Sequence, residues 1–132
     1  MQFCDIRITK QPLDAAVPCF SRTEGAVVDF FGVVRNIENE RIIEGIEYEA
    51  FEAMAERQLT LIADAARDHF GLVSVIIHHR TGFVPAGEAS LFVRVTACRR
   101  RAAFEGSSQI IEQLKQVVPI WKHPVYASAQ IA

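Results

Sequence analysis

Lysine is scarce in this sequence of 132 residues. Three of its fourteen basic side chains are lysines, and the other eleven are arginines. Codon bias alone produces such a ratio, so the count says little about function. The two side chains nevertheless suit different tasks, because arginine grips oxyanions with a rigid fork, whereas a partly desolvated lysine exchanges a proton more readily. The positions of the lysines are therefore more informative than their number.

Long apolar runs, strong net charge and nucleotide-binding motifs are absent as well. No run approaches the roughly 20 apolar residues of a membrane-spanning helix, and the first ten residues lack the basic and apolar regions of a secretory signal. A net charge of −2 does not favour general binding of nucleic acid. Neither Gly-x-Gly-x-x-Gly nor a P-loop occurs, so a nucleotide-phosphate cradle of these kinds is absent and we expect no cofactor. The absent apolar run and the low net charge lead us to expect no membrane or nucleic-acid partner. The composition, 50% hydrophobic and 23% charged, predicts one globular domain over residues 1–132.

Cysteines and histidines are too few and too scattered to indicate a metal site. Cys4, Cys19 and Cys98 form no Cys-x-x-Cys pair, so we expect no metal and a reducing, cytoplasmic compartment. Cys98 precedes three arginines; a buried cysteine at a strand end is favoured there over a reactive thiol. His78 and His79 are adjacent on a predicted strand and point to opposite faces, so core or hydrogen-bonding roles are expected.

Periodicity along the chain predicts both strands and helices. Alternating or β-branched runs indicate strands, and apolar residues spaced three and four apart indicate helices. The predicted strands are residues 2–9, 25–35, 43–51, 72–79, 88–97 and a short one at 126–131; the predicted helices are a short one at 12–16 and long ones at 52–70 and 102–118. Consecutive strand pairs favour an α+β fold over a doubly wound sheet.

A basic segment follows a mildly acidic body. Residues 1–98 have a net charge of −5, and residues 99–122 have a net charge of +3. Arg99, Arg100 and Arg101 stand where a predicted strand leads into a predicted helix, and the amides and dipole of a helix N-terminus favour an anion there. A phosphate site and a solvated basic turn are both open interpretations of this cluster.

Two of the three lysines lie near the end of the last predicted helix. Lys115 stands beside its apolar stripe, and Lys122 follows Trp121. A lysine in such a place either acts as a general acid or base or extends its amine into water. Arg101 and Lys115 are 14 residues apart, about 21 Å along one helix, too far for one small ligand to reach both. We therefore hypothesise a dimer in which one chain brings its arginines to the other chain's Lys115.

A series of motifs runs through about residues 3–124 and supplies a resemblance. The motifs are Gly25–Asn36, Ile46–Met54, His79–Gly82, Pro85–Glu88, Arg100 with Ala103-Phe104-Glu105, Leu114-Lys115 and Pro119–Lys122. No single motif is specific, but their combination and order resemble the large, catalytic subunit of molybdopterin synthase, the MoaE family. The resemblance implies an α/β-hammerhead fold with an additional antiparallel β subdomain.

The same resemblance implies a sulfurtransferase of molybdenum cofactor biosynthesis. Members of the family convert a cyclic pyranopterin monophosphate, precursor Z, to molybdopterin by installing the two sulfurs of a dithiolene. The donor is the thiocarboxylated C-terminus of a small ubiquitin-like subunit, MoaD, in a heterotetramer built on a dimer of large subunits. By motif position, Lys115 and Lys122 match the catalytic lysines, of which Lys115 assists proton transfer. The matched substrate-binding residues are Val33, Val34, Arg35, Arg99, Arg100, His123 and Pro124.

Two features depart from the family pattern. Arg99 stands where the family usually has histidine. Arginine at this position can still bind phosphate but cannot transfer a proton, because it stays charged. The segment 125–132 does not match the longer family tail. The alternative interpretations are a non-catalytic anion- or partner-binding paralogue of the same fold and a purely structural homodimer.

Overall fold

The structure is a computed structural model, and it describes residues 3–128. In chain order its elements are β1 (Cys4–Thr9), β2 (Ala26–Val33), β3 (Ile37–Glu38), β4 (Arg41–Ala50), α1 (Glu52–Phe70), β5 (Ser74–Arg80), β6 (Gly82–Pro85), β7 (Ala89–Ala97), α2 (Arg100–Val117) and β8 (Ile120–Tyr126). Neither helix is long and apolar enough to span a membrane.

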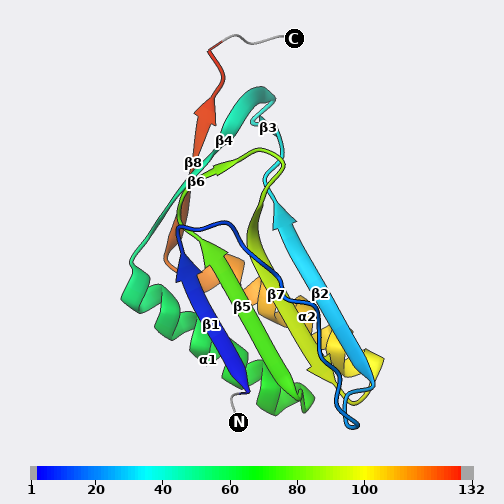
Figure 1. Cartoon of the computed structure of the whole chain (residues 1–132). Coiled ribbons are helices and arrows are strands. Elements are labelled where there is room, and N and C mark those ends of the chain that lie inside the picture. The colour runs from blue at the N-terminus through cyan, green and yellow to red at the C-terminus, as the bar shows by residue number, and fades with distance from the viewer. Residues whose placement is uncertain (1–2, 129–132) are drawn as a thin grey trace.

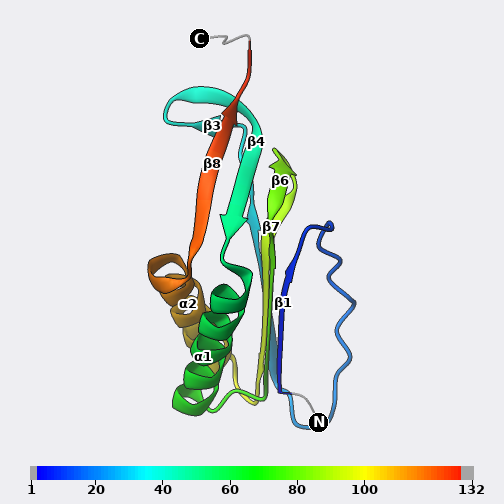
Figure 2. The same cartoon turned by 90° about the vertical axis from the view of Figure 1, so that its left-hand side faces the viewer.

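One four-stranded sheet carries both helices on a single face. Its strand order is β1-β5-β7-β2, with α1 and α2 side by side on one side (Figures 1 and 2). β1 is parallel to β5, and β7 is antiparallel to both of its neighbours. Successive strand residues point to opposite faces, so Val75 and Ile77 of β5 and Val93 of β7 meet the helices in the main core.

The first helix shows why its bounds were predictable. Leu59, Ile62, Ala63 and Ala66 recur on its buried face. Gly71 ends the helix in the left-handed conformation, with φ 66°, and donates its N–H to the carbonyl of Arg67. Glycine adopts this conformation without the clash of a Cβ, which is why the helix ends there. The helix predicted over residues 52–70 is confirmed by the bounds of α1.

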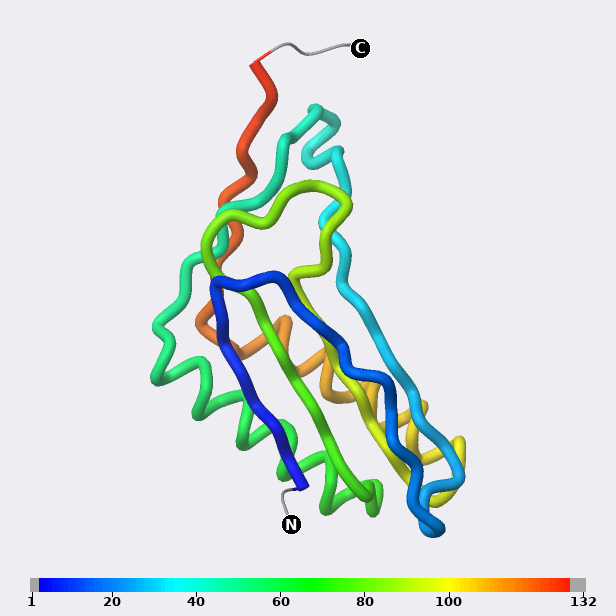
Figure 3. Tube along the Cα trace, viewed as in Figure 1, coloured from blue at the N-terminus to red at the C-terminus, as the bar shows by residue number. Residues whose placement is uncertain are grey.

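A second, smaller sheet extends beyond the end of the first. β4 pairs with β3, β6 and β8, all antiparallel, and Figure 3 shows this sheet above the helical layer. Ile46 and Tyr48 of β4 are buried, and Glu47 and Glu49 are exposed, as the alternation predicted. The small core of this sheet also holds Val34.

The short helix predicted at 12–16 is wrong. Residues 12–20 form an irregular segment that runs along the face of the first sheet opposite the helices (Figure 2). A helix of this length has a costly nucleus and gains little from propagation. Pro18 further restricts Val17 to extended conformations, so the local pattern cannot hold a helix.

The last strand lies earlier than predicted. β8 covers Ile120–Tyr126, whereas the expected strand covered 126–131, of which residues 129–131 lie outside the described part of the chain. Pro124 pairs with Ile46 within β8. Proline is tolerated there because β8 is an outer strand of its sheet, which leaves one side of its backbone without ladder hydrogen bonds.

Candidate active site

A cavity of about 630 Å³ lies where the end of α2 meets both sheets. Its apolar wall includes Phe30, Leu91, Leu114 and Ile120. Its polar lining comes from six separate segments and consists of Arg35, Tyr48, His79, Ser90, Lys115 and Lys122. The cavity is therefore a product of the tertiary fold rather than of one motif.

Cationic side chains dominate this cavity. Lys115 comes from the last turn of α2, Lys122 from β8, and Arg35 from the segment after β2. Lys122 stands opposite Tyr48 in the β8–β4 register, and cross-strand partners point to the same side of a sheet. No carboxylate is among the described residues that line the cavity. The local field therefore favours an anionic ligand.

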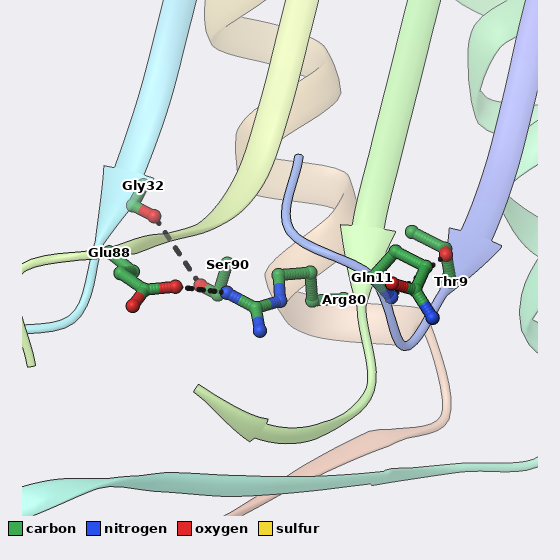
Figure 4. A network of polar contacts seen from close by, with 6 residues as sticks. All are labelled: Thr9, Gln11, Gly32, Arg80, Glu88 and Ser90. Atoms are coloured by element: carbon green, nitrogen blue, oxygen red, sulfur yellow. Dashed lines mark hydrogen bonds and ion pairs between the residues drawn. The ribbon is translucent and has the colours of Figure 1, made fainter. Parts of the chain in front are cut away.

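A hydrogen-bonded set of side chains forms the other side of the cavity. The Tyr48 hydroxyl donates to Ser90 Oγ at 3.1 Å. Ser90 Oγ in turn donates to the Gly32 carbonyl oxygen at 3.4 Å (Figure 4). Burial raises the pKa of Tyr48, so its phenol stays protonated. The ring of His79 packs edge-on against Tyr48 with centroids 5.3 Å apart.

The two adjacent histidines have the hydrogen-bonding roles that were expected. His78 Nε2 lies 3.1 Å from Asp5 Oδ2, and His79 Nδ1 lies 2.7 Å from the Arg80 carbonyl oxygen. Burial lowers the pKa of His79; the hydrogen bond to Arg80 opposes this, and the Lys122 charge adds to it. That His79, Tyr48 and Ser90 line the cavity was not predicted, because no local pattern brings β5, β4 and β7 to one place.

Four other residues match family substrate-binding positions near the cavity, and they differ in whether they line it. Val33 lines the cavity, whereas Val34 is 3% exposed, belongs to the small core and is not part of the lining. His123 and Pro124 also lie outside the lining. The Nε2 atom of His123 is 3.6 Å from Glu49 Oε1, on the face of the small sheet opposite to Tyr48.

The arginine cluster lies at the opposite end of α2. Arg99 and Arg100 line a second hollow of about 840 Å³, together with Cys98. The first turn of α2 has no acidic residue and no side-chain cap, so its positive dipole is not neutralised. Arg100 and Lys115 are separated by about 22 Å of helix. One chain therefore holds two separate cationic sites.

Cys98 corrects one expectation. It was expected to be buried at a strand end, but it is exposed. The reason is its position one residue past β7, where the chain leaves the sheet for Arg99, the N-cap of α2. Among residues 3–128, no group of three or more histidine, cysteine or acidic side chains could hold a metal ion.

Comparison with known proteins identifies the family of the chain. The family model described as MoaE protein matches residues 6–117. The chain belongs to the MoaE family. It is 42% identical over 108 residues to a molybdopterin synthase catalytic subunit of Oryza sativa, which covers 81% of this chain and 55% of the relative. It is 35% identical over 125 residues to the Pyrococcus abyssi catalytic subunit, which covers 91% and 84% of the two chains. The chain thus spans about half the length of the rice relative and most of the archaeal one.

Solved structures of MoaE proteins share the fold. A molybdopterin synthase structure from Staphylococcus aureus superimposes with a TM-score of 0.83 at 28% identity, covering 93% of this chain and 92% of the other. A complex of subunits 1 and 2 of the molybdopterin-converting factor from Helicobacter pylori gives a TM-score of 0.69 at 28% identity, over 83% and 72%. The fold is accordingly the expected α+β class, an α/β-hammerhead with an additional antiparallel subdomain.

Proposed function

We propose that this chain is the catalytic subunit of a molybdopterin synthase. It transfers sulfur from the thiocarboxylated C-terminus of a small ubiquitin-like subunit, MoaD, to a cyclic pyranopterin monophosphate, and the product is the dithiolene of molybdopterin. The curated relatives with this name support the activity, and the two-subunit complex from Helicobacter pylori supports the partner.

The observation that carries the proposal is the cavity that Lys115 and Lys122 share. A thiocarboxylate and a phosphate monoester are both anions, and among the described residues Arg35, Lys115 and Lys122 line this cavity with no carboxylate beside them. Lys115 assists proton transfer at the thiocarboxylate, and Lys122 positions substrate and stabilises its charge. Arg35 supplies a guanidinium fork for the phosphate or the pterin.

We further propose that residues 1–132 form one MoaE-like domain and that two copies of the chain form a homodimer within a heterotetramer. Each working site then combines residues of both copies. The separation of Arg100 from Lys115 supports this arrangement, because a partner chain could bring its Arg99 and Arg100 to the lysines. The substrate contacts proposed for His123 and Pro124 rest on motif position, because neither residue lines the cavity, and Val34 acts through the backbone it anchors. Free Cys4, Cys19 and Cys98 are compatible with a cytoplasmic location.

Conversion in vitro tests the activity. The purified chain is mixed with thiocarboxylated small subunit and the cyclic pterin monophosphate, and molybdopterin is measured as its fluorescent oxidised pterin. Lys115→Ala should lower turnover by about 100-fold or more. Lys10→Ala is the matched control, because Lys10 is exposed and lies outside the cavity. Absence of product with a verified partner contradicts the proposal, and partner binding without turnover supports the non-catalytic paralogue.

A further inference from the structure

His79 is a buried imidazole whose tautomer is set by the backbone. Its side chain lines the cavity, and the residue is 5% exposed. Nδ1 lies 2.7 Å from the carbonyl oxygen of Arg80. A carbonyl oxygen only accepts, so Nδ1 carries the proton and Nε2 keeps its lone pair. No hydrogen bond to a side chain or backbone group of residues 3–128 engages Nε2.

The remaining ionisable groups of the cavity cannot replace this lone pair. They are Tyr48 from β4, Lys115 from α2, Lys122 from β8 and Arg35 after β2. The guanidinium of Arg35 stays charged, and the raised pKa of Tyr48 keeps its phenol protonated. Lys115 and Lys122 already have other roles in the proposed transfer, at the thiocarboxylate and at the charge of the substrate. Burial lowers the pKa of His79, and the Lys122 charge acts in the same direction, so the imidazole is neutral at neutral pH. Nε2 is thus the proton acceptor that the described lining offers.

The proposed sulfur transfer needs such an acceptor. When a thiocarboxylate sulfur bonds to a substrate carbon, the sulfur is still attached to the acyl carbon of the donor, and the intermediate is a thioester. Release of the sulfurated product requires water to cleave the acyl–sulfur bond. A water molecule attacks an acyl carbon more readily when a base takes its proton.

We propose that His79 is the general base of this hydrolysis, an inference that rests on the proposed function. The water oxygen bonds to the acyl carbon while one proton passes to Nε2. The carbon–sulfur bond to the acyl group breaks, and its electron pair remains on the sulfur of the product as a thiolate. The donor leaves as a carboxylic acid, which ionises to solvent, and the imidazolium returns its proton to the thiolate or to water. No oxidant or reductant takes part.

His79→Asn tests this role with little change of shape. The asparagine amide can replace Nδ1–H as the donor to the Arg80 carbonyl, but it has no basic nitrogen. We expect the thioester between donor and substrate to accumulate, as seen by mass spectrometry, and its hydrolysis to slow by about 100-fold. In the wild-type chain we expect the hydrolysis rate to fall at acidic pH as His79 becomes protonated. This fall should be absent from the variant. Hydrolysis at the wild-type rate with an unchanged fall at acidic pH would overturn the assignment.

The adjacent histidine provides the matched control. His78→Asn changes the same residue type on the same strand, but His78 faces Asp5 on the other side of the sheet, so its rate and pH profile should match wild type. Nitrogen-15 NMR of the wild-type chain gives a measurement independent of folding of the variants. A neutral Nδ1–H tautomer above pH of about 6.5 supports the inference, and an Nε2–H tautomer overturns it. Absence of product from the wild-type chain counts against the proposed function alone, because the NMR result still decides whether His79 can act as the base.

Discussion

Arg94 and Asp29 form a two-pronged ion pair across β7 and β2. Arg94 Nε lies 2.7 Å from Asp29 Oδ1, and Nη2 lies 2.9 Å from Oδ2. The two residues are direct partners in the strand register. The side chain of Arg94 is 8% exposed and that of Asp29 is 30% exposed. The pair thus neutralises a buried guanidinium on the sheet face opposite the helices.

Removal of the carboxylate should therefore destabilise the fold. Asp29→Ala leaves the Arg94 charge buried without its partner, and we expect the free energy of unfolding in urea to fall by about 3 kcal/mol. The double variant Asp29→Leu/Arg94→Met should recover most of this loss, because no charge remains buried. Arg101→Ala is the surface comparison: it breaks an exposed pair with Glu105 and should cost less than about 0.5 kcal/mol. Equal losses for Asp29→Ala and Arg101→Ala would contradict this account.

Acid should weaken the fold partly through His79. Its pKa is lowered in the folded state by burial, so the unfolded chain takes up the proton first as the pH falls. The stabilisation is present above the unfolded pKa of about 6.5 and is lost as the pH falls through the folded pKa. His79→Asn should reduce the loss of unfolding free energy between neutral and mildly acidic pH. Urea titrations at several pH values measure it, and an identical acid-induced loss in the variant would refute the prediction.

Local sequence patterns predicted the elements whose determinants lie within one segment. The apolar stripe and the terminal Gly71 define α1, and the alternation around Tyr48 defines β4. The position of β8 is different, because it depends on pairing with β4, some seventy residues away. Its proline is acceptable only at the outer side of the sheet, which the sequence does not reveal.

The candidate site was predictable to the same extent. Lys115 and Lys122 stood out because lysine is scarce and because both match a family motif, and the structure places them in one cavity. His79 was expected only to have a core or hydrogen-bonding role. Its place in the cavity arises from the packing of its ring against Tyr48 of β4, and neither adjacent residue indicates this contact. Distance along α2 could be calculated from residue numbers, so the separation of Arg100 from Lys115 was foreseeable.

Close approach of two strands makes Gly45 a sensitive position. A Cβ at this residue would lie against the carbonyl oxygen of Val84 and 2.6 Å from Phe83 Cζ. Gly45→Ala should lower the free energy of unfolding by about 2 kcal/mol. It should also lower turnover, because Gly45 and Tyr48 share β4 and both pair with β6.

Gly71→Ala is the comparison for this variant. A Cβ there meets no atom within 4 Å, and only the positive φ opposes it. We expect a loss of about 1 kcal/mol with normal turnover. Thermal unfolding and the molybdopterin assay, run on both variants, separate strain near the cavity from strain remote from it. Normal turnover and stability in Gly45→Ala would mean that β6 moves away freely.

Mixing of inactive variants tests whether a site combines two chains. Lys115→Ala and Arg100→Ala are each expected to be inactive, since each removes one part of every site. After subunit exchange, each heterodimer has one site with both Lys115 and Arg100 intact, so about a quarter of wild-type activity should return. Lys115→Ala mixed with Lys122→Ala is the control, because both lysines line the same chain's cavity and no intact site can form. No rescue in the first mixture, once mass spectrometry shows full exchange, would exclude sites shared between two copies of the chain. Rescue in the control would instead contradict the placement of Lys115 and Lys122 of one chain in the same working site.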